Sequence, residues 1–299
     1  MEKVKITFLG TSNAIPTKKR NHTAIVINYK NETILVDCGE GTQRQFKIAG
    51  ISPFKITRLL ITHWHGDHIL GLPGLFQTLV MSGYEKTLKI YGPKRTKFFL
   101  STIEKLMSEH KINTSAEEII SGKFIDTPEF SISAESMEHG TPTLAYSLTI
   151  KDKYRLDKAK IKSLGLPNSA LLRDLKKGKD IKFNNKKIKA SNITYLEKGK
   201  KITIILDTAF NKKAIEFAKE SDLLICEAMF TSEDEVTAKE YKHLTASQAA
   251  EIAKKSKSKS LLLTHLSQRY EKEPGKIEKE AKEIFPQTKT VKDFDTILV

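Results

Sequence analysis

The chain has 299 residues, 39% of them apolar, and a formal net charge of +15 at pH 7. This length allows one large domain or two small ones with an ample core. No apolar run approaches the roughly 18 residues that span a membrane, and the N-terminus lacks a signal peptide's apolar core. Two cysteines, Cys38 and Cys226, are too few for a disulfide framework, so we expect no membrane segment and a reduced, cytoplasmic compartment.

The first half of the chain alternates between strand and helix patterns. Short β-branched runs bounded by turn residues predict strands at 4–9, 23–28, 33–36, 56–61, 88–91 and 130–137. A helix is expected at 41–49, closed by Gly50, and another from Pro93 to about residue 109.

The second half repeats this alternation. Apolar runs predict buried strands at 202–206, 223–225 and 261–263, and helices are expected at 211–220, 245–257 and 274–285. Thr245, followed by Gln248 three residues later, is typical of a helix N-cap. The order of elements predicts an α/β fold.

Five apolar runs each end directly in a polar segment whose side chains could bind a metal ion or act in catalysis. The residues at these ends are Asp37, His63, Asp207, Glu227 and His265. Sites in layered α/β folds gather at the carboxyl ends of strands, so we expect these residues to converge on one pocket. The alternative, ordinary strand-to-loop polarity, predicts Gly, Asn, Ser and Lys as often as Asp, Glu and His.

The most specific signal is the segment 62–68, which reads THWHGDH. In an extended segment, His63 and His65 point the same way and can hold one metal ion. If the chain turns at Gly66 into a helix, Asp67 and His68 face the other side and can hold a second ion. Imidazole with one carboxylate suits zinc better than calcium or magnesium. The alternative is a chance cluster, which the spacing of four such residues disfavours.

His139 and His265 each follow a predicted strand, and Asp207 has two oxygens with which to bridge two cations. Alone, such a histidine is more often a structural residue than a ligand. Beside a half-built two-metal site, we expect both to be ligands. Two metal ions about 3.5–4 Å apart are a common device for hydrolysing phosphodiesters.

Residues 151–189 differ from the rest of the chain. They carry fourteen Lys and Arg against four Asp, a net charge of +10 out of +15. Leucines and an isoleucine between 161 and 175 predict a short helical hairpin around Gly165 and Pro167. A solvated surface, or the basic bias of a Lys-rich proteome, is the alternative. A protruding basic arm that binds nucleic acid accounts better for so uneven a distribution.

Asp37, the 63–68 motif, His139, Asp207 and His265 occur in an order that resembles the metallo-β-lactamase superfamily. The closer match is to ribonuclease Z, the family of tRNA 3′-processing endonucleases. It rests on the segments GTS (10–12), PTKKRN (16–21), DCGEGTQRQ (37–45) and THLSQRY (264–270), and on a basic insert between the third and fourth metal motifs. The likeness runs from about residue 6 to residue 270.

The resemblance implies an αββα sandwich, that is, two mixed β-sheets flanked by helices. We therefore expect a single domain over residues 1–299 with an inserted basic arm at 151–190 that serves as a tRNA-binding exosite. It also implies two zinc ions per subunit, one held by His63, His65 and His139, the other by Asp67, His68 and His265, with Asp207 bridging. Asp37 would orient the histidines without being a ligand.

The resemblance further assigns roles in catalysis. Asp67 would steer or accept the proton of the attacking water, and His243, held by Glu227, would protonate the departing 3′ oxygen. We expect contacts with tRNA, by position and charge, from a set of basic residues: Lys18, Arg20, Lys176, Lys177, Lys179 and Arg269. Departures from the family pattern are Leu206 for a Gly, Cys226 for a His and Met229 for a Thr, while Pro167 and Gly178 keep part of the arm's Gly/Pro character.

The predicted activity is removal of the 3′ trailer from precursor tRNA, which leaves a 3′ hydroxyl on the tRNA and a 5′ phosphate on the trailer. The family resemblance also implies a homodimer. The alternatives are a broader RNA phosphodiesterase or exonuclease of the same superfamily and a non-catalytic RNA-binding protein. The complete set of ligand types disfavours the latter. A small-molecule hydrolase would not need an arm of charge +10. His22, His110 and Trp64 have no predicted role.

Overall fold

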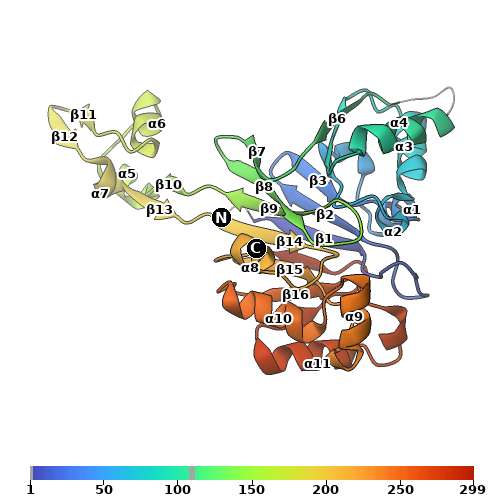
Figure 1. The fold of residues 1–299 in the computed structure, drawn as a ribbon. Coiled ribbons are helices and arrows are strands. Elements are labelled where there is room, and N and C mark those ends of the chain that lie inside the picture. Colours follow the sequence, from blue (N-terminus) through green and yellow to red (C-terminus); the bar gives the residue numbers. More distant parts are fainter. Residues whose placement is uncertain (1–2, 108–111) are drawn as a thin grey trace. The chain divides into compact units, whose positions relative to one another are not determined.

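The computed structural model describes residues 3–107 and 112–299 of the chain (Figure 1). The chain divides into two compact units. The larger unit comprises residues up to 126, 132–148 and 201–299, and the smaller one comprises 127–131 and 149–200. Within the described residues, no helix combines the length and apolar content needed to cross a membrane.

The first sheet of the larger unit has seven strands in the order β18-β1-β2-β3-β4-β5-β6. Strands β18, β1, β2 and β3 pair antiparallel, whereas β3, β4, β5 and β6 pair parallel. In chain order these strands are β1 (Lys5–Gly10), β2 (Ala24–Tyr29), β3 (Glu32–Val36), β4 (Arg58–Leu60), β5 (Leu88–Gly92), β6 (Thr114–Glu118) and β18 (Thr296–Leu298). The sheet is therefore mixed.

The second sheet also has seven strands, in the order β17-β16-β15-β14-β9-β8-β7. Strands β14 to β17 pair parallel with one another. The strands are β7 (Gly122–Asp126), β8 (Phe130–Met137), β9 (Thr143–Ile150), β14 (Lys200–Ile205), β15 (Leu223–Glu227), β16 (Leu261–Thr264) and β17 (Thr288–Thr290). Tyr146 of β9 joins the two sheets, because its hydroxyl donates to the carbonyl of Ile61 at 2.7 Å.

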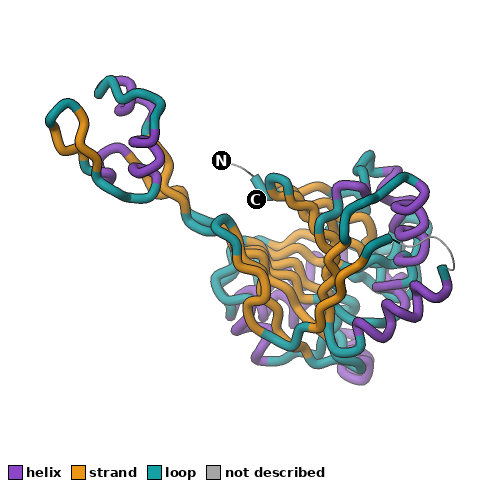
Figure 2. Tube along the Cα trace, turned by 90° about the horizontal axis from the view of Figure 1, so that it is seen from above, coloured by secondary structure: helices purple, strands orange, loops and turns teal. Residues whose placement is uncertain are grey.

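Helices cover one face of each sheet (Figures 1 and 2). The first sheet packs against α1 (Thr42–Ile48), α3 (Leu72–Met81) and α4 (Thr96–Leu106), with the short α2 (Gly66–Ile69) and η1 (Pro53–Lys55) nearby. The second packs against α8 (Lys212–Phe217), α10 (Ala246–Lys255) and α11 (Gly275–Ile284), and α9 (Glu235–Tyr241), η2 (Ser232–Asp234) and η3 (Gln268–Tyr270) complete this side. Two mixed sheets flanked by helices confirm the predicted fold class.

The elements predicted from sequence are present, with shifted boundaries. The strand expected at 56–61 is the shorter β4, which follows η1 in the chain. The helix expected from Pro93 begins at Thr96, and its predicted end near residue 109 lies outside the described residues, as does His110. The polar edge strand β6 was not predicted because it has no apolar period, and α3 was missed although its buried residues Leu72, Leu75, Phe76 and Leu79 follow a helical period.

The smaller unit has its own core of buried side chains. Strands β10 (Lys153–Leu156) and β13 (Thr194–Glu197) pair antiparallel, as do β11 (Ile181–Phe183) and β12 (Lys186–Ile188). Helices α5 (Lys158–Ser163), α6 (Ala170–Lys176) and α7 (Ala190–Ile193) complete it. Helices α5 and α6 confirm the predicted hairpin. The core consists of Leu166, Leu175, Ile181, Ala190 and Ile193.

Candidate metal centre

The carboxyl ends of strands from both sheets meet in one place. Asp37 and His63 follow β3 and β4 of the first sheet, while Asp207 and His265 follow β14 and β16 of the second. His63 Nε2 lies 3.5 Å from Asp207 Oδ2, so the two sheets contribute to one cluster. Asp37 and His265 both have positive φ angles, near +57° and +58°, which turn the chain sharply as each strand ends. The predicted convergence of the strand ends is confirmed.

The 62–68 segment has the predicted local structure. The chain runs extended through His65, whose ψ is 153°, and then turns into α2 at Gly66. This change of direction separates His63 and His65 from Asp67 and His68. The segment is fixed at its start by Asp37, whose carboxylate accepts hydrogen bonds from the backbone N–H and the hydroxyl of Thr62, each at 2.7 Å.

One group of side chains comprises Asp67, His68, Asp207 and His265. Its facing atoms are almost equally spaced. His68 Nε2 and His265 Nε2 are 3.2 Å apart, and Asp67 Oδ2 is 3.3 Å from each of them. Asp207 Oδ1 lies 3.4 Å from His68 Nε2 and 3.2 Å from His265 Nε2. Tetrahedral ligands about 2.0–2.1 Å from zinc are about 3.3 Å apart, so this spacing fits a metal ion.

A second group comprises His63, His65, His139 and Asp207, and a third comprises Glu227, His243 and His265. His139 Nε2 lies 3.2 Å from His65 Nδ1 and 3.8 Å from Asp207 Oδ2. Asp207 thus belongs to both of the first two groups and presents a different oxygen to each: Oδ1 to the first and Oδ2 to the second. A carboxylate placed in this way is suited to bridging two cations.

Buried atoms without hydrogen-bond partners support the binding of a metal ion at this cluster. Among the described residues, these include His63 Nε2 and Asp207 Oδ1, both of which face the cluster. An orphaned buried polar atom costs roughly 1–3 kcal/mol, so native structures rarely keep one unless something binds it. The donor set of imidazole and carboxylate is the one that divalent transition metals favour. The fold and the clustered His and Asp side chains therefore indicate a metal-ion site.

Asp37 orients the cluster from behind. Its Oδ2 lies 2.7 Å from His68 Nδ1, so the ring's other nitrogen, Nε2, faces Asp67 and Asp207. Asp37 and His68 are fully buried. A carboxylate that holds one ring nitrogen fixes the tautomer and direction of the other. The position of Asp37 agrees with the supporting role that the resemblance implies.

Glu227 and His243 form a second, adjoining pair. His243 Nδ1 lies 3.1 Å from both carboxylate oxygens of Glu227, and Glu227 Oε1 also accepts from the N–H of Thr208 at 2.7 Å. Burial by itself lowers the pKa of His243, but the charge of Glu227 and its hydrogen bond outweigh burial and raise this pKa to about 9. His243 Nδ1 is 3.9 Å from Asp207 Oδ2, so the pair lies beside the metal cluster.

The residues predicted to contact RNA have varied surroundings. Lys18 is exposed, as are Lys176, Lys177 and Lys179 of the smaller unit. Arg20 is instead buried, and its Nη1 donates to Thr11 Oγ1 and to the carbonyl of Val291, both at 2.7 Å. The guanidinium of Arg20 therefore has a structural role, which its sequence position did not indicate.

The departures from the family pattern leave the cluster together. Leu206 and Cys226 are fully buried in the larger unit, and Asp207 still lies 3.2 Å from His265. The side chain of Leu206, which precedes Asp207, is therefore accommodated in the core.

Two positioning groups were missed by the sequence reasoning. The indole N–H of Trp64 donates to Thr96 Oγ1 at 3.0 Å and its ring stacks on Phe99, which ties the segment between His63 and His65 to α4. Asp234 accepts hydrogen bonds from Arg269, at 2.6 Å, and from the hydroxyl of Tyr270. These bonds join the turn after His265 to the start of α9. No sequence signal marked either group, because each depends on a contact between distant segments.

Comparison with known proteins places the chain in a family. Residues 4–155, half of the chain, belong to the sequence family whose model is described as anti-Pycsar protein Apyc1. The metallo-β-lactamase fold protein YhfI from Bacillus subtilis superposes with a TM-score of 0.73 at 18% identity over 100% of both chains, which shows the fold. The short form of human tRNase Z superposes with a TM-score of 0.71 at 27% identity over 98% of both chains.

The Apyc1 model ends before Asp207, Glu227, His243 and His265, so it does not describe the whole cluster. Ribonuclease Z from Methanothermobacter thermautotrophicus does extend over it, with 36% identity across 298 residues, 99% of this chain and 97% of that protein. Because a relative this similar matches nearly end to end, the chain belongs to the ribonuclease Z family.

Proposed function

We propose that this protein is a zinc-dependent endoribonuclease that removes the 3′ trailer from precursor tRNA. The products would be a tRNA with a 3′ hydroxyl and a trailer with a 5′ phosphate. The observation that carries the proposal is the pair of four-membered groups sharing Asp207, with Glu227 and His243 beside them. The family relationship to ribonuclease Z supports tRNA as the substrate.

Each group would hold one zinc ion. His63, His65 and His139 would serve one, Asp67, His68 and His265 the other, and Asp207 both. When bound, the two ions would lower the pKa of water toward neutrality and neutralise charge on the phosphate.

Asp67 would accept or steer the proton of the attacking water. Although burial by itself raises the pKa of Asp67, the charge of His68 and hydrogen bonds from His265 and His68 hold it below its ordinary value. Asp67 is thus a carboxylate over the whole working pH range. Its Oδ2 faces the two histidines, so its Oδ1 is left to contact the water.

His243 would donate a proton to the departing 3′ oxygen. Its Nδ1 is engaged by Glu227, which leaves Nε2 as the atom that meets the substrate. A raised pKa keeps the imidazole protonated near neutral pH, as a general acid requires.

Glu227→Gln tests how the carboxylate sustains this acid. The amide keeps the shape and can still accept from Thr208, but it removes the charge that raises the pKa of His243. Because the acid works only while protonated, we expect the alkaline fall of kcat to begin at a lower pH than in the wild type. The measurement is kcat between pH 6 and pH 10, with the exposed Glu240→Gln as control. An unmoved alkaline limb contradicts the assignment.

The proposed activity is tested directly with a tRNA transcript that carries a 3′ trailer. We expect one cut, a 3′ hydroxyl and a 5′ phosphate at the new ends, and two zinc ions per chain by mass spectrometry. Products shortened one nucleotide at a time would instead indicate an exonuclease.

We also propose that the protein is a homodimer, and analytical ultracentrifugation measures this. We further propose a reducing, cytoplasmic compartment, which agrees with the two free, buried cysteines, Cys38 and Cys226.

We further propose that residues 151–190 form a tRNA-binding exosite. The apolar side chains of the smaller unit form its core, and most of its lysines are exposed to solvent. Contacts between such lysines and phosphates would recognise the folded tRNA by shape and would weaken steeply with salt.

A deletion tests the exosite. Lys153 of β10 pairs with Glu197 of β13, so a short Gly-Ser turn can replace residues 154–196. All residues of the unit's core cluster lie within 154–196, so the deletion removes the cluster as a whole and exposes none of its members. We expect KM for precursor tRNA to rise at least about tenfold, because many phosphate contacts are lost. Hydrolysis of a bis-aryl phosphodiester should not change.

A charge-only variant complements the deletion. Replacing Lys176, Lys177 and Lys179 with alanine keeps the core and should reduce the salt dependence of binding by about one unit of slope per lost phosphate contact. Unchanged binding of precursor tRNA by the deletion variant contradicts the exosite.

A further inference from the structure

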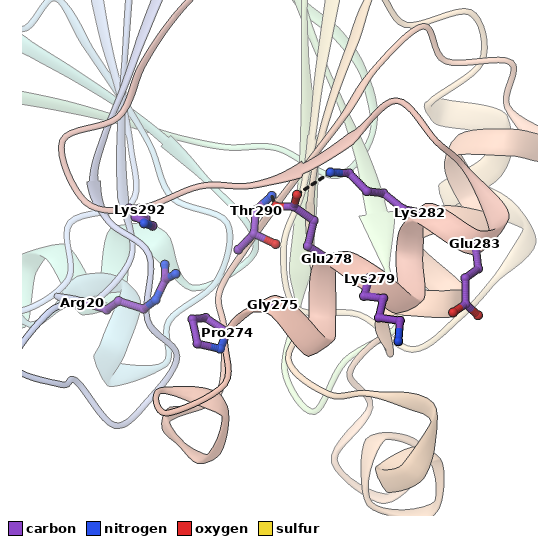
Figure 3. Close-up of a pocket in the computed structure, with 9 residues that line it drawn as sticks. All are labelled: Arg20, Pro274, Gly275, Glu278, Lys279, Lys282, Glu283, Thr290 and Lys292. Carbon is purple, nitrogen blue, oxygen red and sulfur yellow. Dashed lines mark hydrogen bonds and ion pairs between the residues drawn. The ribbon is translucent and has the colours of Figure 1, made fainter.

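A cavity of about 630 Å³ lies in the larger unit at the carboxyl end of β17 (Figure 3). Figure 3 shows Arg20 and Lys292 on one side of it and the side chains of α11 on the other. Its lining consists of Arg20, Pro274, Gly275, Glu278, Lys279, Lys282, Glu283, Thr290 and Lys292. Of these residues, only Arg20 was predicted to contact tRNA, and none has a role in the activity proposed above.

The cavity lies along the same sheet edge as the metal cluster. Strands β16 and β17 are parallel, and Leu263 pairs with Thr290, two residues before His265. Arg20 donates to the hydroxyl of Thr11. The backbone carbonyl of Thr11 accepts a hydrogen bond from the N–H of Leu266. The cavity therefore lies beside the segment that carries His265.

The charges that line the cavity are unevenly matched. Of its two carboxylates, Glu278 is already engaged: Oε1 binds Lys282 at 2.5 Å, and Oε2 accepts from the N–H of Thr290 at 2.8 Å. Within the described part of the chain, Lys279 and Lys292 have no ion-pair partner. The nearby carboxylate of Asp293 is held by Thr11 and Asn21. The lining itself carries four basic side chains, Arg20, Lys279, Lys282 and Lys292, against two carboxylates, Glu278 and Glu283.

Two neutral features also favour an anion. The N-terminus of the ten-residue helix α11 opens at Gly275, and no side chain caps its first turn. A helix N-terminus attracts negative charge through its free N–H groups. Thr290 is 8% exposed, and its hydroxyl is one of the buried atoms without a hydrogen-bond partner among the described residues. Such an atom indicates that something polar completes the site.

We infer that this cavity binds an unpaired nucleotide of the 3′ trailer, an inference that rests on the proposed function. The phosphate would lie against Lys279, Lys292 and the N-terminus of α11, and the nucleoside against Pro274 and the aliphatic stem of Lys279. A cavity of this size is in the range of small-ligand pockets, roughly 300–1,000 Å³, and is too small for a duplex. An unpaired strand is therefore the part of the substrate that fits.

The experiment compares trailers of one, four and eight nucleotides on the same tRNA. The variant is Lys279→Ala with Lys292→Ala, and the matched control is Lys219→Ala with Lys254→Ala, two exposed lysines outside the cavity. For the cavity variant we expect KM to rise about tenfold with longer trailers, a lower salt slope, and a change under twofold with the shortest. The control should match the wild type at every length.

The possible failures are distinguishable. A wild-type protein that leaves every trailer uncut overturns the proposed function. If the wild type cuts all three and the cavity variant weakens them equally, or not at all, the trailer site is overturned while the function stands. The same length dependence in the control variant attributes the effect to net charge and also overturns the site.

Discussion

Replacing Asp207 with alanine is expected to remove the bound metal and to slow cleavage at least about a thousandfold. Asp207 is the one side chain that belongs to both metal groups, and its loss leaves His63, His68 and His265 without their shared anionic partner. Metal ions supply several kcal/mol of transition-state stabilisation, and each ~1.4 kcal/mol is a factor of ten in rate. Metal content by mass spectrometry and kcat on precursor tRNA measure the two effects.

A matched control separates loss of the site from loss of the fold. Asp126→Ala removes an exposed carboxylate that forms an ion pair with Lys123 and is not one of the proposed ligands. It should keep both ions and full activity. Thermal melting of the metal-free proteins shows whether Asp207→Ala still folds. An Asp207→Ala protein that retains two ions and cleaves at the wild-type rate would contradict the two-metal proposal.

Replacing His243 with alanine is expected to lower kcat on RNA by about 100- to 10,000-fold without releasing metal. A positioned general acid typically contributes that factor. Metal should remain because His243 is not one of the residues proposed to hold the ions. Single-turnover cleavage of precursor tRNA and metal content are the measurements.

The leaving group provides the control for this variant. A nitrophenolate departs without a proton, so hydrolysis of bis(p-nitrophenyl) phosphate by His243→Ala should change much less than cleavage of RNA. Equal losses on both substrates would show that the histidine supports the metal centre instead of the leaving oxygen. No loss on RNA would remove it from the mechanism.

Features that depend on residues close together in the chain were predicted correctly from the sequence. The Thr245 N-cap with Gln248 forms the predicted capping box, because these bonds join residues three apart. The turn at Gly66 into α2 was equally local. Boundaries were less predictable. β4 spans only three residues, and the polar strand β6 lacks any apolar alternation. Such elements form because a neighbouring strand supplies hydrogen bonds.

By itself, the sequence determined the types and order of the proposed ligands, because strand ends and the spacing of the 62–68 motif are local properties, and its family resemblance predicted the αββα fold. Only the tertiary structure decided how the two sheets share Asp207, since that contact joins residues 144 apart in the chain. It alone decided that Trp64 packs on α4, that Arg20 is buried, and that Lys279 and Lys292 line one cavity. Each of these depends on long-range packing, which no single segment encodes.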